Sequence, residues 1–182
     1  MSNASPSAMY APLRVHGHHS MLTGVDSPAA LVARARELGL EALALCDVDT
    51  LAGVVEFLNA VRAANEDLRS ASPPSPPLRA IVGAELSDPS GAPGRVVALV
   101  ENETGWRNLC KLVSARHLGD DPGRPGARLD GPEHFRLADQ VVRHREGLIF
   151  LVDHPRLLVA LAGRVDARSL FAALSPASLA LS

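Results

Sequence analysis

The sequence has few cysteines and no long apolar run, and each shortage excludes a class of protein. Its two cysteines lie in separate segments without a CxxC pair, so neither a disulfide framework nor a thiolate zinc site is expected. No apolar stretch reaches the roughly 18 residues that a membrane helix needs. Residues 1–9 lack the charged and apolar regions of a signal peptide and are expected to be a disordered leader or a tag remnant. The expected location is therefore cytoplasmic.

An excess of positive charge is also missing. The 18 Lys and Arg residues stand against 20 Asp and Glu residues, which leaves a formal net charge of -2. A domain that binds nucleic acid tightly by itself normally has a basic excess or a basic stripe. Direct, tight DNA binding by this chain alone is therefore not expected. Only 3% of the residues are aromatic although 47% are hydrophobic, so Leu, Val and Ala must fill the core.

What the sequence does contain is an alternation of strands and helices. Short apolar runs predict strands at 11–16, 41–46, 79–86, 95–101, 147–153 and 178–182. Capping and spacing predict helices at 28–39, 51–64, 104–117, 134–145, 155–163 and 166–174. Stretches rich in Pro or Gly, at 69–78 and 118–133, are expected to be loops within one domain, 10–182. This alternation predicts an α/β fold with a mainly parallel sheet or barrel and helices outside it.

Polar side chains follow several of these predicted strands, at the ends where chemistry collects in such folds. They are His16, His18, His19, Asp47, Asp49, Glu85, Asp153 and His154. Such residues are the usual ligands of zinc, manganese or iron, which can activate water and hold a phosphoryl group. In the competing interpretation, His18 and His19 are solvated loop residues, and Asp47 and Asp49 cap the next helix. A Ser20, His18 and Asp47 hydrolase triad is not expected, because no GxSxG elbow is present.

At these loops the sequence resembles the PHP (polymerase and histidinol phosphatase) domain of bacterial family C DNA polymerases, meaning the DNA polymerase III alpha subunits and their error-prone relatives. The likeness runs without a gap from LRVHGHHS, which begins at Leu13, to Gly53. It continues at IVGAEL (81–86), ALVENETGWRNLCKLVS (98–114) and GLIFLVDH (147–154). The GWRNLC segment points to the polymerase branch rather than to free-standing phosphatases. The resemblance implies a PHP-type (β/α)7 distorted barrel, incomplete at the C-terminus.

The same resemblance implies seven metal-ligand positions along this stretch, of which the sequence keeps three. The matching residues are His16, Glu85 and His154, and the positions lost are Arg14, Thr23, Val48 and Arg95. Two of the losses put a fixed positive charge where a cation would sit, and the Arg14 guanidinium is expected to pair with Glu85 or Asp47 instead. The expectation is that no cofactor binds. The alternative is one zinc or manganese ion bound by His16, Glu85 and His154, with His18 or His19 as a further ligand.

The function implied is a largely non-catalytic scaffold in a polymerase of DNA replication or translesion synthesis. The polymerase carboxylates lie far downstream in the family, so this chain is not expected to polymerise DNA. The implied partners are the rest of the polymerase chain, a proofreading exonuclease subunit, and DNA through the parent polymerase alone, with no membrane. Two alternatives stay open: a metal-dependent phosphoesterase or 3′-5′ exonuclease of the same superfamily, and a stand-alone protein-interaction module.

An incomplete barrel would expose the apolar face of its last strand. Three explanations are open: the chain is a truncation, the tail at 157–181 caps that edge, or a partner chain covers it.

Overall fold

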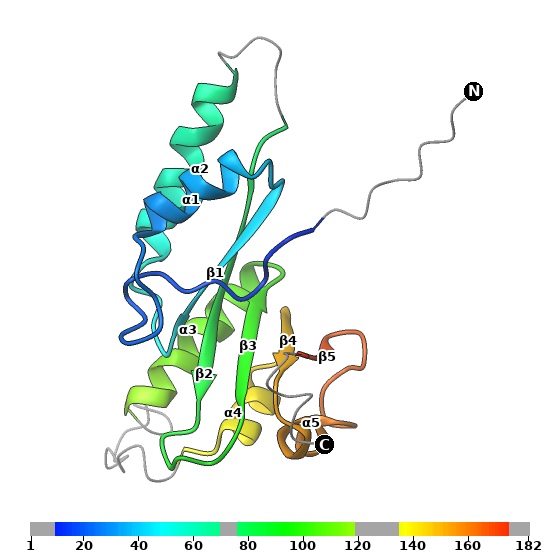
Figure 1. Ribbon diagram of the computed structural model, residues 1–182. Helices are drawn as coiled ribbons and strands as arrows, with labels where there is room; N and C mark the ends of the chain where they lie inside the picture. The colour runs from blue at the N-terminus through cyan, green and yellow to red at the C-terminus, as the bar shows by residue number, and fades with distance from the viewer. Residues whose placement is uncertain (1–9, 70–75, 119–134, 175–182) are drawn as a thin grey trace, which may run out of the picture.

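The computed structural model describes residues 10–69, 76–118 and 135–174 (Figure 1). The strands are β1 (Ala42–Val48), β2 (Arg79–Ser87), β3 (Arg95–Val100), β4 (Leu148–Val152) and β5 (Leu170–Ala172). The helices are α1 (Pro28–Glu37), α2 (Val54–Arg69), α3 (Glu103–Leu118), α4 (Leu137–Arg143) and α5 (Pro155–Leu161). None of these helices has the length and apolar character needed to cross a bilayer.

The predicted start of α1 at Pro28 and its stop at Gly39 are confirmed by its caps. Ser27 Oγ accepts a hydrogen bond from Ala30 N at 3.1 Å, and Pro28 occupies the first turn, where no backbone donor is needed. At the other end Gly39 takes a φ of +67°, which a glycine adopts without strain, and Leu40 N donates back to Ala35 O at 2.9 Å. The helix therefore ends just before Gly39.

The five strands form one sheet in the order β1-β2-β3-β4-β5. β1 is parallel to β2 and β4 is parallel to β5, but β3 runs antiparallel to both of its neighbours. The expectation of a mainly parallel sheet is therefore only half right. The short link between β2 and β3, residues 88–94, explains the reversal, because a parallel crossover needs a dozen or more residues. The carboxyl ends of β1, β2 and β4 consequently lie at the same end of the sheet, where β3 begins at Arg95. This end of the strands is called the shared sheet edge, or Glu85 edge, below.

Helices cover one face of the sheet, and the N-terminal segment lies beside β1 (Figure 1). On the helix face, α1 and α2 pack against Leu43 and Leu45, while α3, α4 and α5 pack against residues of β2, β3 and β4. The opposite face carries Ala44, Cys46, Val97 and Leu99, with Leu13 packed against them. Within the described residues β1 and β5 each pair with one strand only, so the sheet is open. This helix-free face is the one that holds Glu85.

Residues 11–16 were expected to form a strand, and the structure corrects this. The segment lies along the free edge of β1, where Ala44 N donates to Pro12 O at 3.0 Å and Cys46 N donates to Val15 O at 2.8 Å. It is not a regular strand in the structure. Pro12 has no N–H to return a hydrogen bond to β1, which limits the pairing.

The predicted helix at 166–174 is also wrong, because residues Leu170–Ala172 form β5. Asp166 Oδ1 accepts from Arg168 N at 2.9 Å, which turns the chain, and Phe150 N then donates to Ser169 O at 2.7 Å. Residues Leu170–Ala172 thus extend the sheet beside β4. The predicted strand at 178–182 and nearly all of the predicted loop at 118–133 lie outside the described residues, as do residues 70–75 of the other loop.

Candidate functional site

An ion-pair network centred on Glu85 lies at the shared sheet edge. The Glu85 side chain is fully buried. Arg14 Nε donates to Glu85 Oε2 at 2.5 Å and Arg14 Nη2 donates to Oε1 at 2.9 Å, while Arg95 Nη1 donates to Oε1 at 2.7 Å. His16 Nε2 lies 2.9 Å from Oε2. The expected pairing of Arg14 with Glu85 is confirmed, and its second carboxylate partner is Asp153, at 3.2 Å, rather than Asp47.

Hydrogen bonds keep Glu85 ionised despite its burial. Burial alone would raise the pKa of this carboxyl group, but hydrogen bonds from His16, Arg14 and Arg95 outweigh that effect and hold the pKa well below its usual range. The hydrogen bond to Glu85 in turn raises the pKa of Arg14. Asp153 Oδ1 accepts from the backbone N of Arg95 at 2.8 Å. Two guanidinium groups and two carboxylates therefore balance each other at this edge.

This network does not fit a divalent cation. Each oxygen of Glu85 already has two nitrogen neighbours, and an ion at Glu85 would face two guanidinium groups that keep their charge at any physiological pH. Cys46, on the same face, offers no thiolate, because burial and then the nearby charges of Glu85 and Asp47 raise the pKa of its thiol. The chemistry of the site is ion pairing.

Asp47 lies on the other face of the sheet from Glu85. In the parallel register Val48, not Asp47, is the partner of Glu85, and neighbouring residues of a strand point to opposite faces. Asp47 Oδ1 accepts from Gly17 N and from Ser20 Oγ, both at 2.7 Å. Ser20 Oγ accepts in turn from Val48 N at 3.0 Å. The buried pair of Ser20 and Asp47 thus fastens the 17–26 loop to β1, and it is not a hydrolase triad.

Asp49 joins β1 to β2 rather than capping α2. Its carboxylate accepts from Ser87 N at 2.8 Å and from Ser87 Oγ at 2.6 Å, and Arg116 Nη2 lies 3.3 Å away. Because the carboxylates of Asp47 and Asp49 have these partners, the interpretation that they cap the next helix is wrong. The role of Arg116 was not predicted, since nothing in its neighbourhood along the sequence indicates that the last turn of α3 reaches Asp49.

The other predicted ligand positions do not converge on Glu85. His154 lies at the start of α5, and its Nδ1 is buried without a hydrogen-bond partner among the described residues. Within the described part of the chain, His18, His19 and Glu56 form the one group of three whose ligand atoms all lie within 4.8 Å of one another. His16 and Glu85 therefore meet without His154. Thr23 is exposed, and its hydroxyl donates to Met21 O at 3.3 Å.

The GWRNLC segment of α3 contacts the residues just before β4. Gly105 N donates to Asn102 Oδ1 at 3.1 Å, and Asn108 Nδ2 donates to Glu146 O at 2.9 Å, just before β4. A Cβ at Gly105 would overlap the carbonyl oxygen of Gly147. The segment therefore locks α3 against the beginning of β4.

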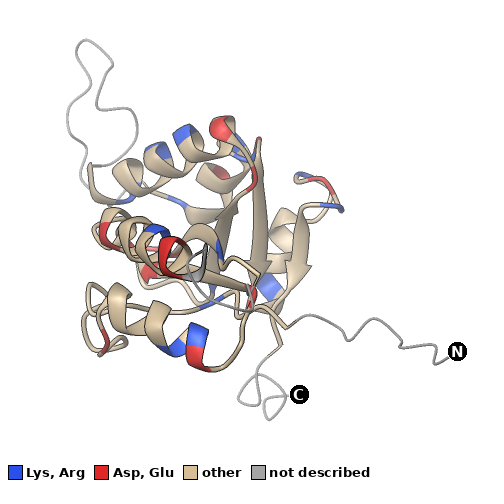
Figure 2. Cartoon of the chain, turned by 90° about the horizontal axis from the view of Figure 1, so that it is seen from above, with Lys and Arg blue, Asp and Glu red and all other residues tan. Residues whose placement is uncertain are grey.

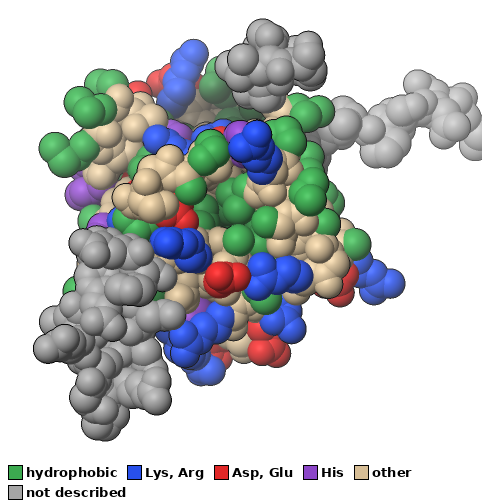
Figure 3. All heavy atoms as spheres, turned by 90° about the horizontal axis from the view of Figure 1, so that it is seen from below, with side chains coloured by type: hydrophobic (Ala, Val, Ile, Leu, Met, Phe, Trp, Pro, Cys, Tyr) green, Lys and Arg blue, Asp and Glu red, His purple; other side chains and the backbone are tan. Residues whose placement is uncertain are grey.

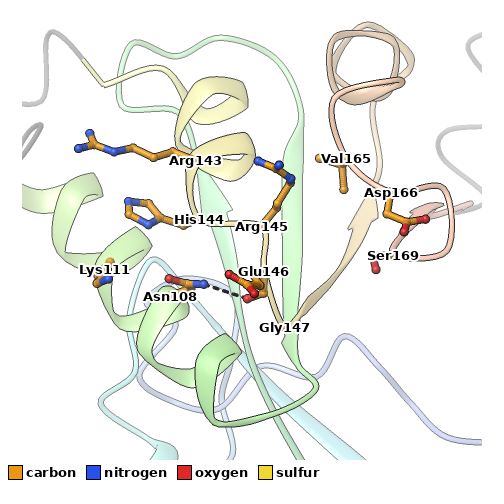
Figure 4. A pocket seen from close by; sticks show the side chains of 10 residues that line it. All are labelled: Asn108, Lys111, Arg143, His144, Arg145, Glu146, Gly147, Val165, Asp166 and Ser169. Carbon is orange, nitrogen blue, oxygen red and sulfur yellow. Dashed lines mark hydrogen bonds between the residues drawn. The ribbon is translucent and has the colours of Figure 1, made fainter.

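A cavity of about 750 Å³ opens beside this junction, at the opposite end of β4 from Asp153 (Figure 4). Residues from α3, from the end of α4 and the link to β4, and from the segment before β5 line it. They are Asn108, Lys111, Arg143, His144, Arg145, Glu146, Gly147, Val165, Asp166 and Ser169. None of the predicted site residues is among them, so this cavity and the Glu85 network are separate features.

The charged side chains are mixed over the described surface. Figure 2 shows basic and acidic residues side by side along the helices rather than a stripe of one sign. Figure 3, which views the molecule from below, shows Lys and Arg side chains beside acidic ones around an apolar centre. This mixed pattern agrees with the small net charge of the sequence.

Known proteins resemble this chain over most of its length. The sequence model of the PHP domain matches residues 12–178. The error-prone DNA polymerase of Anaeromyxobacter sp. (strain K) is 43% identical over 114 residues, which are 61% of this chain and 9% of that protein. That of Mycobacterium tuberculosis (strain ATCC 25618 / H37Rv) is 38% identical over 120 residues, 65% of this chain and 11% of the polymerase. The matched region is thus about a tenth of the length of these relatives.

Solved structures show a weaker likeness. An amidohydrolase from Chromobacterium violaceum aligns with a TM-score of 0.48 at 18% identity, covering 85% of this chain and 74% of that one. A structure described as a metal-dependent phosphoesterase from Bifidobacterium adolescentis aligns with a TM-score of 0.42 at 21% identity, covering 94% and 60%. Both scores lie below 0.5, so these likenesses add nothing to a functional assignment.

Proposed function

Because the chain belongs to the PHP domain family, we propose that it is the PHP domain of an error-prone type of DNA polymerase and serves there as a largely non-catalytic scaffold. The observation that carries the proposal is the pair of guanidinium groups on Glu85. A metal-dependent hydrolase needs an open coordination position for water. Here Arg14 and Arg95 take the place of the cation and hold the sheet edge together by charge.

The ion pairs give the scaffold a definite mechanical role. Arg14 comes from the N-terminal segment, Glu85 from β2, and Asp153 follows β4, so one set of hydrogen bonds ties three parts of the chain together. Arg95 adds the first residue of β3. A relative that keeps metal ligands would join the same parts through an ion. In this chain Arg14 and Arg95 keep these parts connected by ion pairs, without the hydrolytic chemistry of a metal ion.

The helix-free face is the surface on which the rest of the polymerase would pack. Ile149 and Leu151 are only partly buried there, and Phe171 is 47% exposed. A hollow of about 280 Å³ between the N-terminal segment, Leu151 and Leu174 lies on the same side. Further strands of a (β/α)7 barrel would cover this face. The domain would contact DNA and a proofreading exonuclease only as part of the parent polymerase, in the cytoplasm.

Phosphoester hydrolysis tests the scaffold role. With Mn²⁺ added, the chain is expected to hydrolyse neither p-nitrophenyl phosphate nor a 3′-tailed DNA above the rate in buffer, because the Glu85 edge offers no metal-bound water. Glu85→Gln is expected to behave identically. Turnover by the wild type that disappears in Glu85→Gln, while that variant keeps its circular dichroism spectrum, would establish the phosphoesterase alternative in place of the scaffold.

A further inference from the structure

Three side chains of metal-ligand type meet where the 17–26 loop touches the first turn of α2. His18 Nε2 and His19 Nε2 lie 3.2 Å apart, and Glu56 Oε2 lies 3.9 Å from the first and 4.0 Å from the second. Between 33% and 42% of each side chain is exposed, so an ion can reach them from solvent. We propose that His18, His19 and Glu56 bind one divalent cation of the zinc type.

The spacing suits a tetrahedral ion. Zinc–nitrogen distances of about 2.0 to 2.1 Å put two ligand atoms of a tetrahedral site about 3.3 Å apart, close to the spacing of the two imidazoles. The two rings meet edge-on, at 69°, which lets both Nε2 atoms approach one point. A rotation of the exposed Glu56 side chain closes the remaining gap. Two imidazoles with one carboxylate favour zinc over magnesium or calcium, which prefer oxygen ligands alone.

Asp47 places a negative charge directly behind this group. Its side chain is 2% exposed, and Oδ2 has no hydrogen-bond partner among the described residues. A Cβ at Gly53 would lie 2.6 Å from Asp47 Oδ2 and 3.0 Å from His19 Cδ2, so the glycine lets carboxylate and imidazole come close together. A buried carboxylate oxygen without a partner is costly. A cation on His19 offsets that cost.

The loop that carries both histidines is fixed before any ion arrives. His18 N donates to Asp26 O at 2.8 Å, Ser20 N donates to Gly17 O at 2.9 Å, and the buried Ser20 hydroxyl anchors the loop to Asp47. Little chain entropy therefore remains to be lost on binding. Water completes the coordination on the exposed side. Because Asp47 and Glu85 lie on opposite faces of the sheet, this site is separate from the Glu85 network.

Metal titration of the 182-residue chain tests the proposal. Calorimetry with ZnCl2 is expected to give one ion per chain, and CoCl2 is expected to give the intense visible absorption of a four-coordinate ion. Mn²⁺ and Mg²⁺ are expected to bind at least about tenfold more weakly than Zn²⁺. Glu56→Gln should weaken zinc binding about tenfold or more, and the double variant His18→Ala, His19→Ala should abolish it.

Two further variants separate this site from other carboxylates and imidazoles. Glu66→Gln makes the same change at an exposed position of α2 and should leave the zinc affinity unaltered, and His154→Ala should do the same. The proposal is overturned if the wild type binds no ion, if binding persists in the double histidine variant, or if His154→Ala removes it. Circular dichroism establishes that each variant is folded. Failure here leaves the scaffold role standing, since that role rests on Glu85.

Discussion

Glu85→Gln is expected to lower the free energy of unfolding by about 2 to 4 kcal/mol, because removing one partner of a buried ion pair leaves the others uncompensated. Gln keeps the size of the side chain but cannot neutralise Arg14 and Arg95, and its amide would place two donors against their guanidinium groups. The lower part of the range allows for the partial exposure of both Arg side chains, 34% and 44%. Urea unfolding followed by circular dichroism measures the difference.

Glu37→Gln is the matched control for this substitution. Glu37 Oε2 also pairs with an arginine, Arg34, at 2.8 Å, but both side chains are more than 60% exposed. Solvent screens such a pair, so Glu37→Gln should change the free energy of unfolding by less than about 0.5 kcal/mol. Equal, small effects at both positions would show that the Glu85 network does not hold the fold together.

The Glu85 effect should also depend on pH in one direction. The folded state holds the pKa of Glu85 below its usual range, so the carboxylate stabilises the fold fully above the unfolded-state pKa of about 4.3. This stabilisation is lost as the pH falls from there towards the lower folded-state pKa. The stability difference between wild type and Glu85→Gln should therefore be constant from pH 7 to about pH 5 and shrink below about pH 4. A difference that grows on acidification contradicts the assignment.

Gly105→Ala is expected to lower the free energy of unfolding by about 2 to 3 kcal/mol through overpacking. The new methyl group would overlap the backbone carbonyl of Gly147, which cannot rotate away as a side chain could. Gly147 itself has a φ of +72°, and Asn102 Oδ1 lies close to where its Cβ would be, so its backbone has little freedom to shift. The better helix propensity of Ala recovers at most about 1 kcal/mol.

Gly91→Ala separates this clash from the general cost of replacing a glycine. Gly91 has a φ of +77°, but no atom lies within 4 Å of the position its Cβ would take. Only the left-handed backbone then opposes Ala, which costs about 1 kcal/mol. Thermal and urea unfolding should rank Gly105→Ala as the less stable variant. The reverse order would mean that α3 is free to move relative to β4.

Local signals predicted most helices and strands because they are strong in this sequence. Ser27 followed by Pro28, and Gly39 after Leu38, mark both ends of α1. The direction of β3 was missed, although the short 88–94 link excludes a parallel crossover. The sequence predicts a helix over 166–174 and does not reveal Leu170–Ala172 as a strand, because three apolar residues are too few to show a period and their pairing with β4 is a tertiary contact.

The candidate site was predicted in part. The prediction failed where it depended on which side chains the folded chain brings together. Glu85 and Arg14 were correctly expected to meet. The sequence predicts Asp47 and Glu85 together among the polar residues that follow the strands, yet the alternation of side chains along β1 puts Asp47 on the other face. The sequence does not single out Glu56, because one acidic residue in a helical first turn has no distinguishing pattern. It stands out only once the 17–26 loop folds back over α2.

Diffraction from crystals soaked in zinc and manganese, measured at the absorption edge of each metal, tests most directly whether arginine has replaced the cation at Glu85. We expect no anomalous density within bonding distance of Glu85 and His16, with Arg14 and Arg95 still paired to the carboxylate. An anomalous peak coordinated by His16, Glu85 and His154, with Arg14 displaced, would contradict that replacement.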